Sequence, residues 1–426
     1  MRGTDGTGGV PGTPSVLRAM NDRAALELLV SQGPLTRTRI GELTGLSKPT
    51  ASQLLGRLEA AGLVRTTGNV TGRPGPSAQL YEVNPEAAYV AALSVDPGGV
   101  TAVVADITGR VVGEERAAAD GQDTRPTDGQ GSRPTDGEGS RRTDGQDCRP
   151  TGGQDAGSAT ARVVTAAVDG ALAKAGLARG DLHRVVIGTP GALDPRTGEL
   201  RYAPHLPGWH SRALLGELGD ALGVPVVVEN DVNLAALAEQ YEGSAQDHDD
   251  FVLVWVDEGV GAAIVLGGTL LRGATGGAGE IGYMPLPGAP LARGGPDAAA
   301  APDAGGGFQS LVGQPAILTI ARDLGLDPAD AADALADQGV VDEVARRLAT
   351  GLAAVVAVVD PELVVLSGLV AQAGGERLRV RVEEELTGLV LPRPQLRISD
   401  IEGDPILTGA LRTALVQARD VVFDTA

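Results

Sequence analysis

The stretch VPVVVENDVNLAALAE, at positions 224–239, decides the fold of the larger part of this chain. Its valines predict a buried strand, and the run rich in alanine and leucine that follows predicts a helix. Glu229, Asn230 and Asp231 stand where the strand ends, and polar side chains at the carboxyl end of a buried strand are placed for ligand contact. Asp231 could accept a proton from a substrate hydroxyl, and Asn230 could bind a neighbouring hydroxyl. Both residues also suit the N-cap of a helix, which is the plainer interpretation.

Strands with glycine turns lie on both sides of this stretch. Upstream, HRVVIGTPGALDPRTGELRYAPHLPGW (183–209) begins as a buried strand and turns at GTPG, which ends in Gly191. Downstream, FVLVWVDEGVGAAIVLGGTLLRGATGGAGEIGYMPL (251–286) predicts a strand hairpin and a glycine-rich loop that leads to Glu280. VAALSVDPGGVTAVVADITG (90–109) predicts another hairpin, whose glycines would let backbone amides approach a phosphate. The pattern predicts an α/β domain.

The N-terminal part of the chain follows another pattern. Residues 24–30 have the spacing of an amphipathic helix, Thr36 can cap a second helix, and Ser47 can cap a third. LVRTT (63–67) and AQLYEV (78–83) predict two short strands. Three helices followed by a two-stranded wing predict a winged helix-turn-helix, which inserts its last helix into a DNA major groove.

Polar residues of the third helix would then face DNA. We expect Thr50 and Gln53 to contact base edges, and Lys48 and Arg57 to contact phosphates. Arg73, in the wing loop, could reach a minor groove. The expected buried stripe of this helix consists of Ala51, Leu54, Leu55, Leu58 and Ala61. A helical hairpin that docks a protein is the alternative.

The charge of the chain supports this division. The formal net charge is −20, and aromatic residues are few: three Phe, two Trp and five Tyr. Both features argue against general coating of nucleic acid and against a base-stacking platform. Residues 16–76, however, contain eight Lys or Arg against four Asp or Glu, whereas residues 161–426 contain 19 against 36. The only mildly basic part is the predicted DNA-binding module.

A low-complexity insert occupies residues 117–160. It contains the octapeptides GQDTRPTD, GQGSRPTD, GEGSRRTD and GQDCRPTG, which have almost no apolar side chains. Such a segment cannot offset its ordering entropy, so we expect disorder there, as in residues 1–14. A partner-binding role for the repeat stays open.

Cysteine usage and hydropathy bear on location. Cys148 is the only cysteine, which excludes an intramolecular disulfide or a CxxC motif and suits a cytoplasmic protein. The most apolar window, 351–370, is interrupted by Asp360, Pro361 and Glu362. It predicts a buried helix, a turn and a strand, so no membrane contact is expected.

Taken together, GTPG, VENDVNLAALAE, LLRGATGGAGEIG (270–282) and LTGALRTAL (407–415) resemble the ROK family of bacterial repressors, open reading frames and sugar kinases. The resemblance covers residues 21–420 except the insert, and the winged helix is typical of the repressor branch. It implies an α/β fold: a winged helix-turn-helix at 15–88, then a two-lobed actin-like (ribonuclease-H-like) sugar-kinase fold at 89–426. A ligand cleft would lie between the lobes.

The resemblance also implies a sugar site. The residues expected to bind the ligand are Gly191, Asn230, Asp231, Glu280 and Tyr283. Tyr283 replaces a family histidine that also binds zinc, and Gln309 replaces a family glutamate. The family's zinc loop corresponds to residues 290–311, which contain no cysteine, so we expect neither a metal nor a cofactor.

The phosphate loops depart further from the family pattern. The first reads Asp96-Pro97-Gly98-Gly99-Val100, in which Val100 replaces a hydroxyl residue. The second reads Asp257-Glu258-Gly259-Val260-Gly261, whose two acidic residues would repel a polyphosphate. The segment expected near an adenosine reads Ser367-Gly368-Leu369. These changes argue against ATP binding.

We therefore expect a DNA-binding transcriptional regulator, by the resemblance a repressor, that senses a sugar or sugar derivative without phosphorylating it. Its partners would be a double-stranded DNA operator and a second copy of itself, in a homodimer or higher homo-oligomer. Two alternatives stay open. One is an ATP-dependent sugar kinase fused to a DNA-binding domain, with Asp231 as the catalytic base. The other is a regulator whose ligand pocket is vestigial.

Overall fold

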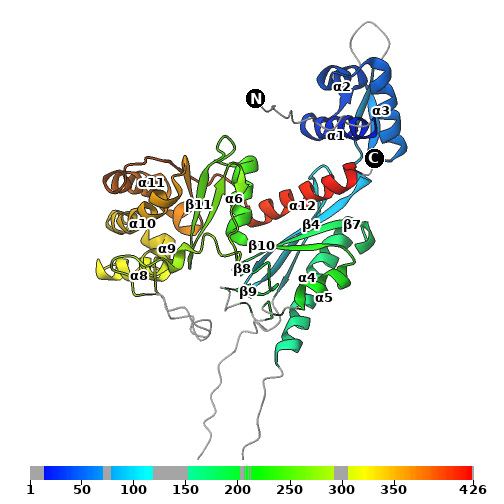
Figure 1. Ribbon diagram of the computed structural model, residues 1–426. Helices are drawn as coiled ribbons and strands as arrows, with labels where there is room; N and C mark the ends of the chain where they lie inside the picture. Colours follow the sequence, from blue (N-terminus) through cyan, green and yellow to red (C-terminus); the bar gives the residue numbers. More distant parts are fainter. Residues whose placement is uncertain are drawn as a thin grey trace, which may run out of the picture.

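The computed structural model describes residues 14–70, 78–118, 152–201, 206, 208–209, 211, 213–291 and 306–424. They form a winged helix domain and two α/β lobes, which confirms the predicted fold class (Figure 1). Arg73 and the octapeptide repeat lie outside the described residues. Strand β6 extends to Ala118 and helix α4 begins at Gly152, so regular structure overlaps both ends of the segment 117–160 that we assigned to the insert.

The winged helix domain contains three helices and a small sheet in the order β1-β3-β2. Its elements are α1 (Pro14–Gln32), β1 (Leu35–Thr36), α2 (Arg37–Thr44), α3 (Lys48–Ala60), β2 (Val64–Val70) and β3 (Ala78–Val83). Thr36 caps α2 and Ser47 caps α3 by accepting backbone N–H groups, as predicted. Ala51, Leu54, Leu55 and Leu58 are buried. The prediction was wrong for Ala61, which is exposed because α3 ends one residue earlier.

Lobe I is built on a five-stranded sheet in the order β10-β7-β4-β5-β6. Its elements are η1 (Pro85–Ala87), β4 (Tyr89–Asp96), β5 (Gly99–Asp106), β6 (Val111–Ala118), α4 (Gly152–Ala175), η2 (Arg179–Asp181), β7 (Leu182–Thr189), β8 (Ala192–Leu193), β9 (Leu200–Arg201), α5 (Leu214–Leu222) and β10 (Val226–Asn230). Strands β4, β5 and β6 are antiparallel, and β7 and β10 run parallel to β4. Helices α4 and α5 pack on one face of this sheet.

Lobe II repeats this topology in a second sheet, in the order β13-β12-β11-β14-β15. Its elements are β11 (Phe251–Val256), β12 (Val260–Leu266), β13 (Thr269–Leu270), η3 (Ile281–Tyr283), α7 (Gln309–Val312), α8 (Gln314–Asp323), α9 (Ala331–Ala334), α10 (Gln338–Val359), β14 (Leu363–Ser367), α11 (Leu369–Leu389) and β15 (Gln395–Ile398). The two parallel strands again follow an antiparallel meander. This duplicated sheet is the actin-like arrangement that we expected.

Two helices connect the parts. Helix α6 (Asp231–Glu242) packs against the lobe II sheet, and α12 (Pro405–Asp424) covers the second face of the lobe I sheet. The two helices cross at Gly409, where an added Cβ would overlap the carbonyl oxygen of Leu234. Figure 1 shows α12 running from α6 to the winged helix domain.

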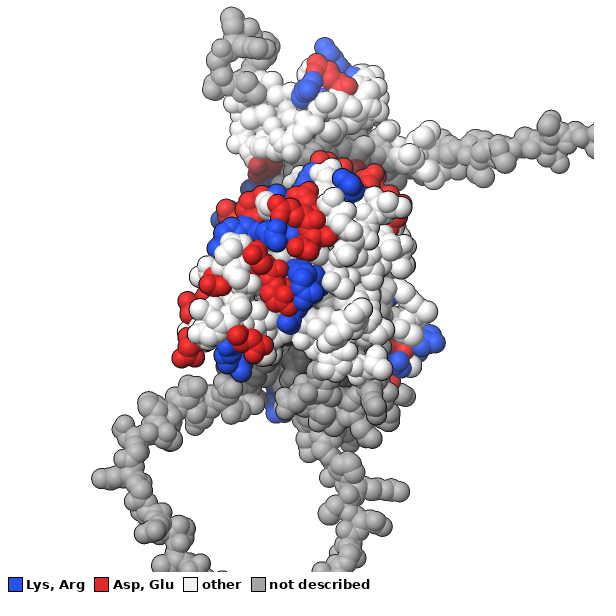
Figure 2. All heavy atoms as spheres, turned by 90° about the vertical axis from the view of Figure 1, so that its left-hand side faces the viewer, with Lys and Arg blue, Asp and Glu red and all other residues white. Residues whose placement is uncertain are grey.

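The outer surface of lobe II is densely charged. Figure 2 shows acidic and basic side chains interleaved on the face formed by α8, α10 and α11. Most of these groups pair along one helix or between α10 and α11, so the acidic excess of this lobe is partly neutralised locally. No helix within the described residues is long and apolar enough to cross a membrane.

The close crossing at Gly409 gives a stability prediction. We expect Gly409→Ala to lower the free energy of unfolding by about 1–3 kcal/mol, because the new methyl group forces α12 away from α6. Urea unfolding followed by circular dichroism measures this change. Gly216→Ala in the exposed part of α5 is the control, since its Cβ meets no atom within 4 Å. The control should raise stability by up to about 1 kcal/mol, and an equal loss in both variants would contradict the prediction.

Candidate ligand cleft and DNA-binding surface

Asn230 forms the N-cap of α6, at the end of β10. Its side-chain oxygen accepts the backbone N–H of Asn233 at 3.0 Å. Its side-chain nitrogen donates to the carbonyl of Gly191 at 3.0 Å and to Oδ1 of Asp231 at 2.9 Å. The capping interpretation of Asn230 is therefore confirmed, and its amide also ties Gly191 to Asp231. Ligand contact by Asn230 stays a prediction.

Asp231 is the first residue of α6 and directly follows β10 of lobe I. Its Oδ1 also accepts the backbone N–H of Val232 at 2.8 Å. The pKa of Asp231 is raised to about 6, mainly because the carboxyl group is buried. The hydrogen bonds lower this pKa, whereas the charge of Asp404, just before α12, contributes to the rise. An aspartate with a raised pKa is a stronger base than an ordinary one, and at neutral pH it still accepts hydrogen bonds from hydroxyl groups.

Glu280 lies in the loop that leads to η3, near enough to Asp231 for that charge to act on it. Burial and, to a smaller extent, the charge of Asp231 together raise the pKa of Glu280 to about 7. Its carboxylate makes no hydrogen bond with any of the residues that the structure describes. Two partly buried carboxylates thus share one site without a cation between them, and hydroxyl donors from a ligand would relieve their desolvation.

An ion pair joins the two lobes beside these carboxylates. Glu229, at the end of β10 in lobe I, accepts from Nε of Arg272 in lobe II at 2.7 Å and from the amide of Asn233 at 2.9 Å. Sequence reasoning missed Arg272, because this pair connects residues that are 43 positions apart and belong to different lobes. Its only signal was an arginine within a glycine-rich loop.

The first predicted phosphate loop is occupied by side chains of the protein itself. Asp96 accepts the backbone N–H of Gly98 at 2.6 Å and forms an ion pair with Arg116 of β6 at 2.9 Å. A Cβ on Gly99 would overlap the carbonyl of Ala117, so pairing with β6 is sufficient reason for that glycine. Sequence reasoning missed Arg116, which neutralises Asp96 within this loop.

The second loop joins β11 to β12 and is held in the same way. Asp257 accepts hydrogen bonds from the side chain of Gln314 and from the backbone N–H of Glu258 at 2.9 Å. Gly259 is exposed, and Gly261 packs against α6, where a Cβ would lie 3.1 Å from Val232. The acidic side chains that we expected to repel a polyphosphate are therefore on the turn itself.

Gln309 and Tyr283 differ in their relation to the cleft. A Cβ built on Gly282 would lie 3.1 Å from Oε1 of Gln309, which places Gln309 beside the segment that follows Glu280. Tyr283, by contrast, is 42% exposed, so its contact with a ligand stays a prediction. Among the described residues no cluster of His, Cys, Asp or Glu could hold a metal ion, and positions 292–305 lie outside them.

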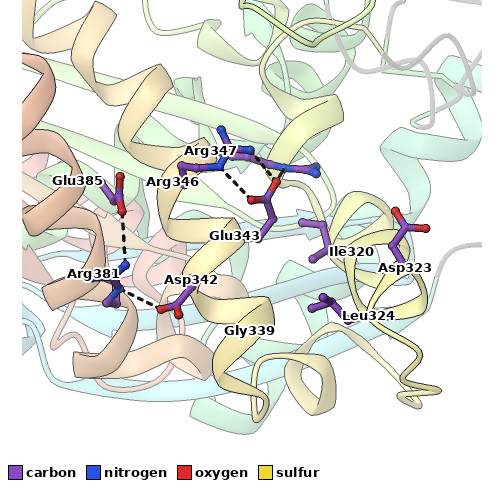
Figure 3. A pocket seen from close by; sticks show the side chains of 10 residues that line it. All are labelled: Ile320, Asp323, Leu324, Gly339, Asp342, Glu343, Arg346, Arg347, Arg381 and Glu385. Carbon is purple, nitrogen blue, oxygen red and sulfur yellow. Dashed lines mark hydrogen bonds and ion pairs between the residues drawn. The ribbon is translucent and has the colours of Figure 1, made fainter.

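A hollow of about 510 Å³ lies elsewhere, on the outer face of lobe II (Figure 3). Three of its four carboxylates have partners: Glu343 binds Arg346 and Arg347, and Asp342 and Glu385 bind Arg381. None of its lining residues belongs to the cleft of Asp231 and Glu280. It is therefore a separate surface feature.

The recognition helix α3 presents the predicted polar residues to solvent. Lys48, Thr50, Gln53 and Arg57 are all exposed. The hydroxyl of Thr50 lies 2.8 Å from that of Ser47 in the N-cap, so Gln53 and Lys48 are left as the freer groups near the start of α3. Base contact by these residues stays a prediction.

Arg57 has a structural partner that the sequence did not indicate. Its guanidinium donates to Asp22 of α1 at 2.6 Å, and the Asp22 side chain is only 4% exposed. An unpaired buried carboxylate costs several kcal/mol, so Arg57 is needed to hold α1 and α3 together. Sequence reasoning also missed Arg37, an exposed residue at the start of α2. Its guanidinium donates a hydrogen bond of 3.2 Å to the hydroxyl of Ser52 in α3.

The raised pKa of Glu280 gives a prediction about pH. The pKa of this carboxyl rises from 4.5 to about 7 on folding. Ionisation of Glu280 therefore lowers the stability of the fold progressively as the pH rises from about 4.5 to about 7. We expect the stability advantage of Glu280→Gln over the native protein to grow by about 2 kcal/mol between pH 5.5 and pH 8.5. Urea unfolding at both pH values measures it. The exposed Glu402→Gln is the control, and a pH-independent difference for Glu280→Gln would refute the interpretation.

Comparison with known proteins agrees with this architecture. The ROK family profile matches residues 154–401, and the MarR family profile matches residues 21–73. A glucokinase of Halalkalibacterium halodurans is 29% identical over 252 residues, which cover 54% of this chain and 76% of that protein. A xylose repressor of Caldicellulosiruptor bescii is 22% identical over 275 residues, which cover 65% of this chain and 61% of that protein.

A solved structure has the same fold over nearly the whole length. It is a ROK family transcriptional regulator, a homologue of the E. coli MLC protein, with a TM-score of 0.67 and 20% identity. The match covers 96% of this chain and all of that chain. The duplicated sheet and the profile that spans more than half of the residues lead to one conclusion: this chain belongs to the ROK family and carries a MarR-like winged helix domain at its N-terminus.

Proposed function

We propose that this protein is a DNA-binding transcriptional regulator, a repressor, whose two-lobed domain binds a sugar or sugar derivative without phosphorylating it. One observation carries the proposal. The cleft carboxylates Asp231 and Glu280 are in place and lack a cation, whereas Asp96 and Asp257 of the phosphate loops are bound to Arg116 and Gln314. A recognition helix with exposed polar residues is part of the same chain.

Sugar recognition follows from the chemistry of the cleft. Vicinal hydroxyl groups are donors that suit carboxylates, and hydrogen bonds to charged acceptors are the strong ones. Asp231 is held through its Oδ1 by Asn230 and by the backbone of its own helix terminus, and we propose its second oxygen as the ligand acceptor. Glu280 comes from lobe II, so one ligand between these carboxylates would contact both lobes and favour a closed cleft.

Phosphoryl transfer needs groups that neutralise the transferring phosphoryl group. In this chain Arg116 is already paired with Asp96 in the first loop. The second loop carries the acidic residues Asp257 and Glu258, which cannot neutralise a phosphoryl group. The kinase alternative has specific support from the raised pKa of Asp231, which suits a general base, and from the glucokinase relative. Activity decides between the two.

Regulation would occur by a population shift. A ligand that binds the closed cleft more tightly than the open one changes operator affinity by the ratio of those affinities. Two copies of the winged helix would read two half-sites, so the functional unit would be a homodimer or a higher homo-oligomer.

The first functional prediction concerns binding without catalysis. We expect at least one member of a sugar panel that includes D-glucose and D-xylose to raise the melting temperature, and Asp231→Asn to abolish that shift. With ATP and Mg²⁺ the same sugar should release no ADP above background in a coupled assay. Turnover that Asp231→Asn removes would instead establish the kinase. No shift with any sugar, together with intact operator binding, would favour a vestigial pocket.

The second prediction concerns DNA. We expect Gln53→Ala to weaken operator binding by about 1–3 kcal/mol, roughly 5- to 150-fold, through lost base contacts at unchanged stability. Fluorescence anisotropy on an operator fragment from genomic footprinting measures it. Arg57→Ala should instead lower the melting temperature, because Asp22 loses its partner. Glu59→Gln on the same helix is the exposed control, and unchanged affinity of Gln53→Ala would show that another surface reads the DNA.

A further inference from the structure

Helix α12 touches both ends of the molecule that a sugar-responsive repressor has to connect. We propose that α12 transmits the state of the ligand cleft to the recognition helix, through the adjacent residues Asp22 and Arg23 of α1. The inference rests on the proposed function for its biological meaning. Its physical content is a mechanical link between α6 and α3, which can be tested separately.

At the cleft, α12 is locked to the helix that carries Asp231. Asp404, just before α12, caps it by accepting the backbone N–H of Ile406 at 2.9 Å and that of Leu407 at 3.1 Å, and its charge influences Asp231. Three residues beyond Ile406, Gly409 lies directly against the carbonyl of Leu234 in α6. The side chain of Ile406 fills the space above β7, where Gly188 has no Cβ. A movement of α6 therefore displaces the start of α12.

One apolar cluster extends from this crossing to the DNA-binding domain. It includes Leu234 of α6, then Ala410, Ala414, Leu415, Ala418, Val422 and Phe423 of α12, and then Ala25, Leu26 and Leu29 of α1 and Leu54, Leu55 and Leu58 of α3. All these side chains are buried. Packed interiors transmit displacement because they have little free volume. A helix of 20 residues is about 30 Å long, enough to span the distance as one rod.

At the DNA-binding end, adjacent residues of α1 bind different neighbours. Arg23 forms ion pairs with Asp420 and with Asp424 of α12, the latter at 3.2 Å. Asp22, the residue before it, binds Arg57 of α3. Helix α1 thus has one charged side chain on the sensor domain and the next on the recognition helix.

The two contacts differ in strength. Asp22 is buried, so breaking its pair with Arg57 is costly, and α1 and α3 should move as one body. The side chains of Asp420 and Asp424 are 48% and 65% exposed. Each ion pair that they form with Arg23 therefore contributes little to the stability of the fold. The ion pairs of Arg23 are therefore the adjustable part of the contact between α1 and α12, which also includes the buried apolar packing of Val422 and Phe423. In this proposal the ion pairs set the angle at which the DNA-binding domain sits on that packing.

Charge reversal at these ion pairs tests the proposal. The variant Asp420→Lys/Asp424→Lys places two cations against Arg23, and adding Arg23→Glu restores attraction. Glu27→Gln is the matched control, because Glu27 binds Arg23 at 2.8 Å within α1 and does not touch α12. Operator affinity is measured with and without saturating D-glucose, and in parallel D-xylose.

We expect a sugar that binds to change the operator affinity of the native protein at least about fivefold. In Asp420→Lys/Asp424→Lys, the operator affinities with and without sugar should differ by less than about twofold, while the sugar-induced shift in melting temperature is retained. Arg23→Glu should restore the native difference, and Glu27→Gln should leave it unchanged. A full sugar response in the reversed variant would overturn the proposal, as would native protein that binds both sugar and operator without coupling them.

A second readout needs neither sugar nor operator. Hydrogen exchange of backbone amides in α1 and α3 should become at least about threefold faster in the reversed variant, return on adding Arg23→Glu, and stay unchanged in Glu27→Gln. Amides of β11 and β14 in lobe II should not change. If the native protein binds no DNA, the proposed function is refuted. The exchange pattern would still decide whether α12 is mechanically linked to α1 and α3. Equal exchange in α1 and α3 of the native and reversed proteins would overturn it.

Discussion

The packing of α12 across α6 is the contact on which the rest of this structure depends. At their crossing, Gly409 brings one helix against the backbone carbonyl of Leu234 in the other, at a distance that no side chain permits. Because α6 covers the lobe II sheet and α12 covers the lobe I sheet, this contact sets how the lobes face each other. It also fixes the helix that begins with Asp231 against the strands of lobe II.

The electrostatics of the molecule divide along the same line. Burial raises the pKa of both Asp231 and Glu280, the charge of Asp231 adds to the rise at Glu280, and neither carboxylate has a cationic partner among the described residues. Elsewhere acidic groups are paired: Asp96 with Arg116 in the first phosphate loop, and Glu343 with its neighbouring arginines on lobe II. Unpaired, desolvated carboxylates are costly to a fold, and this cost is the physical ground on which we propose ligand binding at Asp231 and Glu280.

Local patterns in the sequence were sufficient for the elements and for the family. Helix spacing, the caps Thr36 and Ser47, and the strand before Asn230 are decided within a few residues of each position, so they were predicted correctly. The roles of single polar residues were harder to predict. Thr50 lies in the first turn of α3, where its hydroxyl is 2.8 Å from that of the N-cap residue Ser47, and Arg57, which we expected on phosphates, is bound to Asp22.

The sequence by itself determined the fold class and the family, because these follow from short-range periodicity and from motifs of contiguous residues. Only the tertiary structure decided which charges meet. Arg57 and Asp22 are 35 positions apart, Gln314 and Asp257 are 57 apart, and Arg23 and Asp424 are 401 apart. No local pattern encodes such pairs, since they exist only after the sheets and helices have packed. The ion pairs of Arg23 with Asp420 and Asp424 are of this kind, so the sequence alone gave no sign of this contact between α1 and α12.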